Sequence, residues 1–421
     1  MSALSPAPVL NHPRRRLVGR DPSEAHRAAT PLELLFDLVF VVAFGEAADG
    51  LAHHLAEGHV RVGVLGFGIA MLAVSWAWGS YSWFSSAYDE DDWLSRIATA
   101  VQMLGVAIVA LGLPDVFASL DHHEPLAYQL LVVGYVVMRV PMALQWLRAS
   151  QHDPGRRTTL RSYAATIAVA QAGWTALVVF APPGRVAVPV AVLLAGLEVS
   201  GPLVAERRKG GTPWHAGHIA ERYGLLTIIS LGEGVFGTVA ALSALVHGPS
   251  GWTVDAALVG VAGLGLTFAV WWMYFTVPSG SVLERHRARV LHWSYGHHLL
   301  LASIVAIGAG LHVAALALEG HTRLGATGVV LTVAVPLGVV MVVLHVQWTA
   351  LARPGHALGR TFDVGLTCGG ALVLAAAVGL AALGAPIAVC LVVVAVAPAV
   401  AIARSEEHTS ELQSRFGISY A

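Results

Sequence analysis

The sequence predicts an all-α polytopic membrane protein with about 12 transmembrane helices. Hydrophobic residues make up 56% of the 421 residues and charged residues only 12%, whereas about a quarter of a soluble domain is charged. The mean hydropathy is +0.67. The net charge of -1 does not suggest a nucleic-acid-binding surface, and two cysteines cannot form a disulfide scaffold or a pair of CxxC metal motifs.

Twelve apolar segments are long enough, at roughly 20 residues each, to cross a bilayer. The last of them is the shortest. In chain order, they span residues 31–52, 62–84, 94–113, 127–147, 162–181, 186–204, 218–244, 253–277, 292–318, 326–349, 361–383 and 386–402.

The basic residues of the connecting loops fall almost entirely on one side of this arrangement. Three lie on the other side: Arg61, Arg185 and Arg323. An excess of arginine marks the cytoplasmic side, so we expect both termini in the cytoplasm, in agreement with an even number of helices. The remaining loop arginines and Lys209 follow the even-numbered segments or precede the first.

The chain divides into five regions. Residues 1–29 form an Arg-rich cytoplasmic segment without the apolar stretch of a signal peptide. Residues 30–205 and 218–403 are two six-helix halves, joined by a cytoplasmic linker at 206–217. Residues 404–421 begin with RSEEHTSELQS, which resembles a translated sequencing adapter, so we expect them not to belong to the fold.

The two halves resemble one another. Gly45-Glu46 lies as deep in the first span as Gly232-Glu233 does in the seventh. Aromatic ends of the second and eighth spans, and glycine-containing stretches of the third and ninth, follow in the same order. Six is an even number, so two six-helix repeats would have the same orientation and be related by an axis along the membrane normal.

The first span contains four carboxylates, each costing roughly 2.5–3.5 kcal/mol at a bilayer centre. Glu33 and Asp37 share one helix face, and Glu46 and Asp49 lie on a roughly opposite face. Glu33 follows Pro31 in the first turn, which favours an interfacial position. Asp49 is also expected near an interface, which leaves Asp37 and Glu46 as candidate buried acids.

The seventh span places His218, Arg222 and Glu233 on one side of the helix. Arg222 can extend to the interface or pair with Glu221, whereas Glu233 needs a partner from another helix. Arg139, in the middle of the fourth span, is the candidate counter-charge for Asp37, Glu46 or Glu233. Such a pair is either a static contact that fixes helix register or part of an ion, proton or substrate site.

Two further groups of residues have simpler interpretations. The histidines show no pattern that places three or four ligands on one face, so no metal site is predicted. The tryptophans near the ends of the second and eighth spans favour an interfacial aromatic belt, with the lining of a ligand cavity as the alternative. They are Trp76, Trp78, Trp83, Trp271 and Trp272.

Three stretches together resemble the bacterial low temperature requirement protein A family: TPLELLFDLVFVVAF (30–44), YDEDDWLSR (88–96) and AERYGLLTIISLGE (220–233). The resemblance covers about 30–400 and implies a bacterial inner-membrane protein with many helices, without implying a reaction. Thr276 departs from the family, whose members often have an acid there. The matching positions are Glu33, Phe36, Asp37, Glu221, Arg222, Gly232 and Glu233.

The favoured function is a secondary transporter that couples a proton or ion to a small polar or anionic solute. A cation channel and a membrane-embedded enzyme acting on a lipid or isoprenoid are the alternatives, with a membrane sensor less favoured. No Walker A motif is present, and no cofactor or nucleic-acid partner is expected. The candidate substrate- or ion-binding residues are Asp37, Glu46, Arg139, Glu221, Arg222 and Glu233.

Overall fold

The computed structural model describes residues 15–24, 27–122, 126–208, 210–247, 251–352 and 357–399, which form helices and no strands. Positions 404–421 and the first 14 residues lie outside this description. The helices are α1 (Pro31–Ala56), α2 (Val60–Tyr88), α3 (Trp93–Asp121), α4 (Gln129–His152), α5 (Arg157–Phe180), α6 (Gly184–Glu206), α7 (Ala216–Val246), α8 (Val254–Phe275), α9 (Ser279–Arg285), α10 (Val290–Leu318), α11 (Ala326–Ala352), α12 (Ala357–Ala382) and a last helix, Ile387–Ala399.

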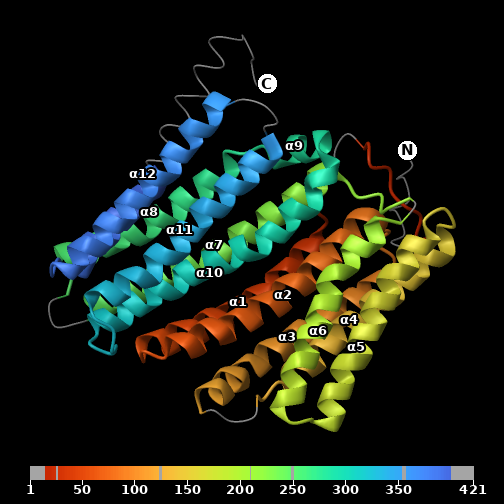
Figure 1. Ribbon diagram of the computed structural model, residues 1–421, viewed down its shortest axis with the longest axis horizontal. Helices are drawn as coiled ribbons and strands as arrows, with labels where there is room; N and C mark the ends of the chain where they lie inside the picture. The colour runs from red at the N-terminus through yellow and green to blue at the C-terminus, as the bar shows by residue number, and fades with distance from the viewer. Residues whose placement is uncertain are drawn as a thin grey trace, which may run out of the picture.

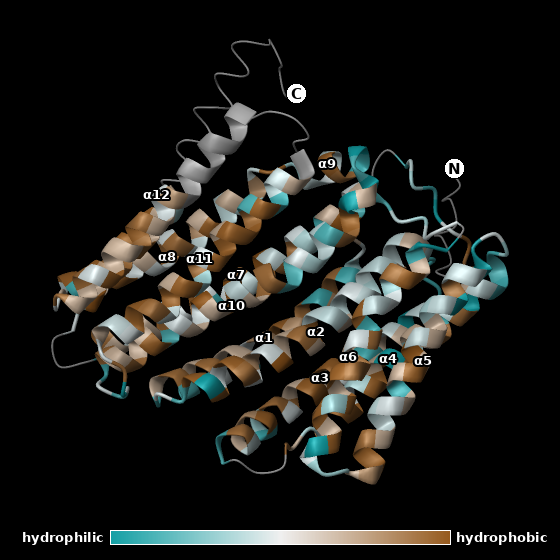
Figure 2. Ribbon diagram, in the orientation of Figure 1, coloured by the Kyte–Doolittle hydropathy of each residue, from teal (hydrophilic) through white to brown (hydrophobic). Residues whose placement is uncertain are grey.

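Nine helices of the described chain are long and apolar enough to cross a membrane. This confirms an all-α membrane protein, whereas the count of twelve spans remains a prediction. Helix α1, with its four carboxylates, is not among the nine, and the apolar part of α12 is the shorter Cys368–Ala382. In Figure 2 hydrophobic residues run along the lengths of the helices, and hydrophilic ones gather near their ends.

Helices α1 and α2 lie between two groups of helices (Figure 1). On one side α3 packs against α1, α2 and α4, and α4 packs against α5, which packs against α6. On the other side α10 packs against α1, α7 and α11, and α8 packs against α7. Helices α1 and α7, the first helices of the two predicted halves, are in direct contact. We call this contact the α1–α7 seam.

Local sequence signals explain where several helices begin. Thr30 caps α1 in a capping box: its hydroxyl accepts from the Glu33 N–H, and the Glu33 carboxylate accepts from the Thr30 N–H at 2.8 Å. Asp92 caps α3 in the same way by accepting from the Ser95 N–H. The short helix α9 was not predicted, because seven residues are too few to produce an apolar period.

The segment before α1 packs across one end of the bundle. Leu17 is fully buried, and the Arg20 N–H donates to the Ala87 carbonyl. The Arg27 guanidinium donates to the carbonyls of Ser85 and Ser86 at the end of α2, a favourable place for a cation. Residues 15–24 and 27–29 of the arginine-rich segment are therefore part of the folded structure at this end.

Candidate functional site

Arg222 of α7 joins two acids of α1 at the α1–α7 seam. Its Nη1 lies 2.9 Å from Glu33 Oε1, and its Nη2 lies 2.5 Å from Asp37 Oδ1. The three side chains are at most 1% exposed. Residues four apart share a helix face, which is why Glu33 and Asp37 both reach one guanidinium. We call these three residues and His218 the seam cluster.

Further contacts hold the seam cluster in place. His218 Nε2 lies 3.2 Å from Glu33 Oε1, and the Trp78 indole N–H donates to Asp37 Oδ1 at 2.7 Å. The Arg222 guanidinium also lies over the rings of Trp78 and Tyr81, 5.9 and 5.7 Å from their centroids. The seam cluster is thus built from α1, α2 and α7.

The seam cluster holds two acids and one permanent cation. Asp37 Oδ2 and Arg222 Nε are buried without a hydrogen-bond partner. A buried excess negative charge is costly, so the arrangement favours uptake of one proton or one cation. Arg27, on the segment before α1, lies 4.0 Å from Asp89 and not against the two acids of the seam cluster.

A second group of ionisable residues lies further along the same seam, in a crevice of about 380 Å³ between α1, α7 and α10. Glu233 lines this crevice and is 8% exposed. Asp49 lies across from it and pairs with His312 at 3.3 Å. Gly237 and Gly308 let α7 and α10 approach so closely that a Cβ added to Gly308 would lie 2.5 Å from the Glu233 backbone.

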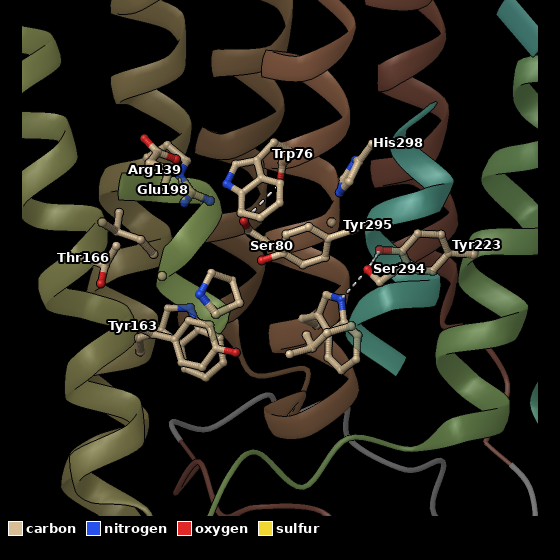
Figure 3. Close-up of a pocket in the computed structure, with 17 residues that line it drawn as sticks. Trp76, Ser80, Arg139, Tyr163, Thr166, Glu198, Tyr223, Ser294, Tyr295 and His298 are labelled. Atoms are coloured by element: carbon tan, nitrogen blue, oxygen red, sulfur yellow. Dashed lines mark hydrogen bonds and ion pairs between the residues drawn. The ribbon is translucent and has the colours of Figure 1, made fainter. Parts of the chain in front are cut away.

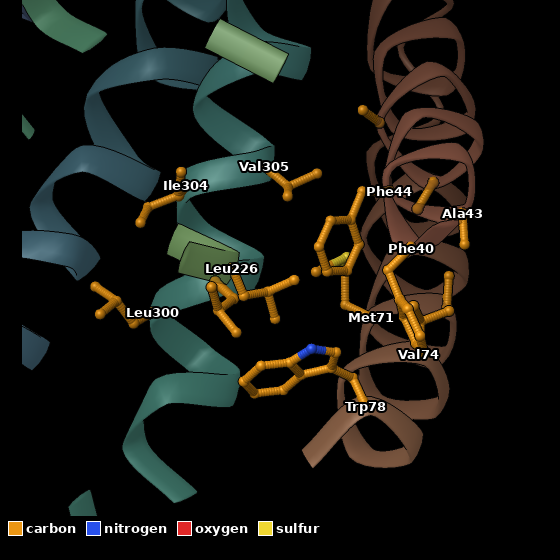
Figure 4. Close-up of a cluster of buried hydrophobic side chains, with 14 of the residues drawn as sticks. Phe40, Ala43, Phe44, Met71, Val74, Trp78, Leu226, Leu300, Ile304 and Val305 are labelled. Carbon is orange, nitrogen blue, oxygen red and sulfur yellow. The ribbon is translucent and has the colours of Figure 1, made fainter. Parts of the chain in front are cut away.

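Figure 4 shows a layer of buried apolar side chains, which along α1 and α7 lies between the residues of the seam cluster and those of the crevice. Phe40 and Phe44 follow Asp37 by one and two turns of α1, and Leu226 follows Arg222 by one turn of α7. Met71, Val74 and Trp78 of α2 and Leu300, Ile304 and Val305 of α10 complete the layer, and all are buried. The polar groups on its two sides therefore do not meet.

A cavity of about 40 Å³ lies between the two groups of helices, large enough for a water molecule or a few heavy atoms (Figure 3). One wall holds a buried ion pair, in which Arg139 Nη2 of α4 lies 3.1 Å from Glu198 Oε2 of α6. The other lining side chains that carry polar groups are Trp76, Ser80, Trp83, Trp146, Tyr163, Thr166, Tyr223, Ser294, Tyr295 and His298.

Comparison with models of known protein families identifies the family of this chain. The model of the bacterial low temperature requirement A protein (LtrA) family matches residues 28–398. The chain belongs to the LtrA family. No curated protein and no solved structure matches this member of the family. The match confirms the resemblance and supports a membrane location, without assigning an activity.

In this LtrA-family chain, the predicted partners of two arginines are wrong. Arg139 pairs with Glu198 and not with Asp37, Glu46 or Glu233. Arg222 turns inward to Glu33 and Asp37, while Glu221 accepts from the Ala29 N–H at 3.3 Å. The physical reason is the rotation of α4 and α7 about their axes, which depends on packing between helices.

The carboxylates of α1 agree with expectation only in part: Asp37 is buried as expected, whereas Glu46 is not. Glu33 lies in the first turn and forms the capping contact, as expected, but its side chain is buried and paired with Arg222. Glu46 is exposed on the surface of the described chain, whereas Glu233 is buried. The two Gly-Glu pairs therefore lie in different surroundings, although Gly45 itself faces the Glu233 carboxylate. Asp49 lies at the mouth of the crevice.

The tryptophans divide into two groups. Trp78 is fully buried in the seam and Trp76 lines the cavity, so an interfacial belt is wrong for these two. Trp271 and Trp272 of α8 are 39% and 40% exposed, which agrees with a position at the surface of the bundle.

The acidic run after α2 is structural. Asp92 pairs with Arg148, and Asp91 lies 2.8 Å from Arg96. Burial raises the pKa of Asp92, but hydrogen bonds from Arg148 and the Ser95 N–H outweigh it and hold the pKa below its usual range. No group of three metal-binding side chains occurs among the described residues.

Sequence reasoning missed Glu198. Its carboxylate accepts from Tyr135 at 2.5 Å, from Gln171 at 2.8 Å and from Trp174 at 3.2 Å, in addition to the Arg139 pair. The signal was present, because Glu198 is an isolated acid in the middle of an apolar span.

Proposed function

We propose that this LtrA-family chain is a secondary transporter of the bacterial inner membrane, which couples a proton or cation to a small polar or anionic solute. The observation that carries the proposal is the seam cluster. Two buried acids share one arginine across the contact between the first helices of the two halves. Motion of one half relative to the other changes this contact. Protonation of either acid changes the same contact, so the two events are linked.

The arrangement along the seam supports a carrier that exposes its groups alternately. The seam cluster lies on the side of the arginine-rich N-terminal segment, and the crevice with Glu233 and Asp49 lies on the other side of the apolar layer. A carrier needs such a closed layer between two accessible states, whereas a channel needs a continuous polar path. We also propose that both termini are cytoplasmic and that the halves, 30–205 and 218–403, form the moving units.

The packing of the helices supports a repeat. Helix α3 contacts α1 and α4, and α10 contacts α7 and α11 in the corresponding way. Helix α2 contacts helices of both groups, whereas its counterpart α8 contacts mainly α7. The two halves are therefore proposed as parallel repeats that have diverged at α2 and α8.

Proteoliposomes test the proposal. Uptake of labelled lactate, phosphate and alanine is measured with and without an imposed pH or cation gradient, for the wild type and for Asp37→Asn. Gradient-driven uptake of a solute that Asp37→Asn abolishes supports the transporter. Unitary currents without saturable uptake would instead support the cation channel, and lipid turnover without uptake would support the enzyme.

A further inference from the structure

The cavity between the two groups of helices contains hydrogen-bond donors that no protein group satisfies. Arg139 Nε and Nη1 and Trp76 Nε1 are buried without partners. In Figure 3 the Trp76 indole nitrogen faces the side of the cavity where Arg139 and Glu198 lie. Arg139 and Trp76 are 4% and 7% exposed, so lipid or bulk water does not satisfy them.

Glu198 cannot supply the missing acceptor. Its Oε1 accepts from Gln171 and Trp174, and its Oε2 accepts from Tyr135 and lies against Arg139 Nη2. Leaving a buried donor unsatisfied is costly, and a guanidinium binds a planar pair of oxygens in its fork. The free donors therefore match the oxygens of a carboxylate. Because Glu198 already neutralises Arg139, such an anion would enter together with the proton or cation of the proposed coupling.

His298 gives the cavity a hydrogen-bond acceptor, in contrast to the free donors of Arg139 and Trp76. Ser75 donates its hydroxyl hydrogen to the Met71 carbonyl, so the Ser75 oxygen accepts from His298 Nδ1 at 2.9 Å. In this tautomer His298 Nε2 is an acceptor, and the imidazole lines the cavity. A ligand with a carboxylate at one end and a hydroxyl at the other would accept from Arg139 and Trp76 and donate to His298 Nε2.

We propose that this cavity is the solute site and that its ligand is a small carboxylate of a few heavy atoms, held by Arg139 and Trp76. The inference rests on the proposed transporter, since it names the class of solute. The volume of about 40 Å³ excludes a lipid chain from the cavity in this conformation. The cavity touches α2, α4, α5, α6, α7 and α10, so both groups of helices would hold the ligand.

Binding to the purified full-length chain in detergent tests the site without requiring transport. Lactate is the probe, because it carries a carboxylate and a hydroxyl, and lactamide is its uncharged counterpart. The variant is Trp76→Phe, which removes the indole N–H and keeps an aromatic ring. Trp271→Phe on the exposed face of α8 is the matched control. Calorimetry gives the affinity, and thermal unfolding shows that each variant is folded.

The proposal expects lactate to bind the wild type and Trp271→Phe equally, and Trp76→Phe roughly tenfold or more weakly, as for a lost hydrogen bond to a charged group. Arg139→Lys should weaken binding further, because lysine lacks the guanidinium fork. Equal binding of lactamide, equal loss in both tryptophan variants, or no binding of lactate would overturn the carboxylate site. Lactate binding without coupled uptake would support the carboxylate site and refute the transporter. Coupled uptake that Trp76→Phe leaves unchanged would support the transporter and refute the carboxylate site.

Discussion

Replacing Arg222 by methionine removes the guanidinium that lies against both Glu33 and Asp37. Both acids are at most 1% exposed, and each has a direct contact with the arginine. Removing one partner of a buried ion pair costs about 3–5 kcal/mol, because an uncompensated charge stays buried. Here two acids are left, so we expect a loss at the upper end of that range, measured by reversible unfolding in mixed detergent micelles.

Two matched variants separate the charge effect from the loss of packing. In Arg222→Met combined with Glu33→Gln and Asp37→Asn no uncompensated charge is left, so much of the lost stability should return. Arg96→Met removes an arginine whose partner Asp91 is exposed, and it should cause no measurable change. The reasoning is refuted if Arg222→Met is no less stable than Arg96→Met, or if the triple variant is no more stable than Arg222→Met.

Three further predictions follow from other parts of the structure. The folded pKa of Asp92 is held below its unfolded value, so its contribution to stability is present above about pH 4 and is lost as the pH falls further. In unfolding measured against pH, the difference in stability between the wild type and Asp92→Asn should therefore shrink in acid. A difference that stays constant with pH would contradict this. Gly308→Val should cost about 1–3 kcal/mol by overpacking α7 against α10, whereas Gly265→Ala, with open space around its Cα, should leave thermal stability unchanged or slightly higher. Phe40→Ala with Phe44→Ala should open the apolar layer and raise proton leak in proteoliposomes, while Phe268→Ala on the exposed face of α8 should not.

The sequence predicted the helices well, because a long apolar stretch in a membrane protein has few alternatives to a helix. It also identified Asp37, Glu46 and Glu233 as candidate buried acids, whereas it placed Arg222 at the interface or beside Glu221. It could not pair them, because the helix that Arg222 faces depends on how far α7 is rotated about its own axis against α1. Arg139 was assigned to the wrong acids for the same reason.

Depth along a helix was predicted better than orientation. Glu46 and Glu233 lie at similar depths in their helices, yet Glu46 faces outward and Glu233 faces the crevice. The apolar layer was also not foreseen, since its members come from four helices and each is an ordinary hydrophobic residue in its own span. These features depend on tertiary packing.

The central claim is that the seam cluster couples an ion to the solute, and simultaneous measurement of solute and proton flux in proteoliposomes tests it most directly. A pH-sensitive dye inside the vesicles and labelled lactate outside give the ratio of protons to solute. We expect a fixed ratio for the wild type and loss of the proton flux in Glu33→Gln with Asp37→Asn. Solute uptake at an unchanged ratio in that double variant would contradict it.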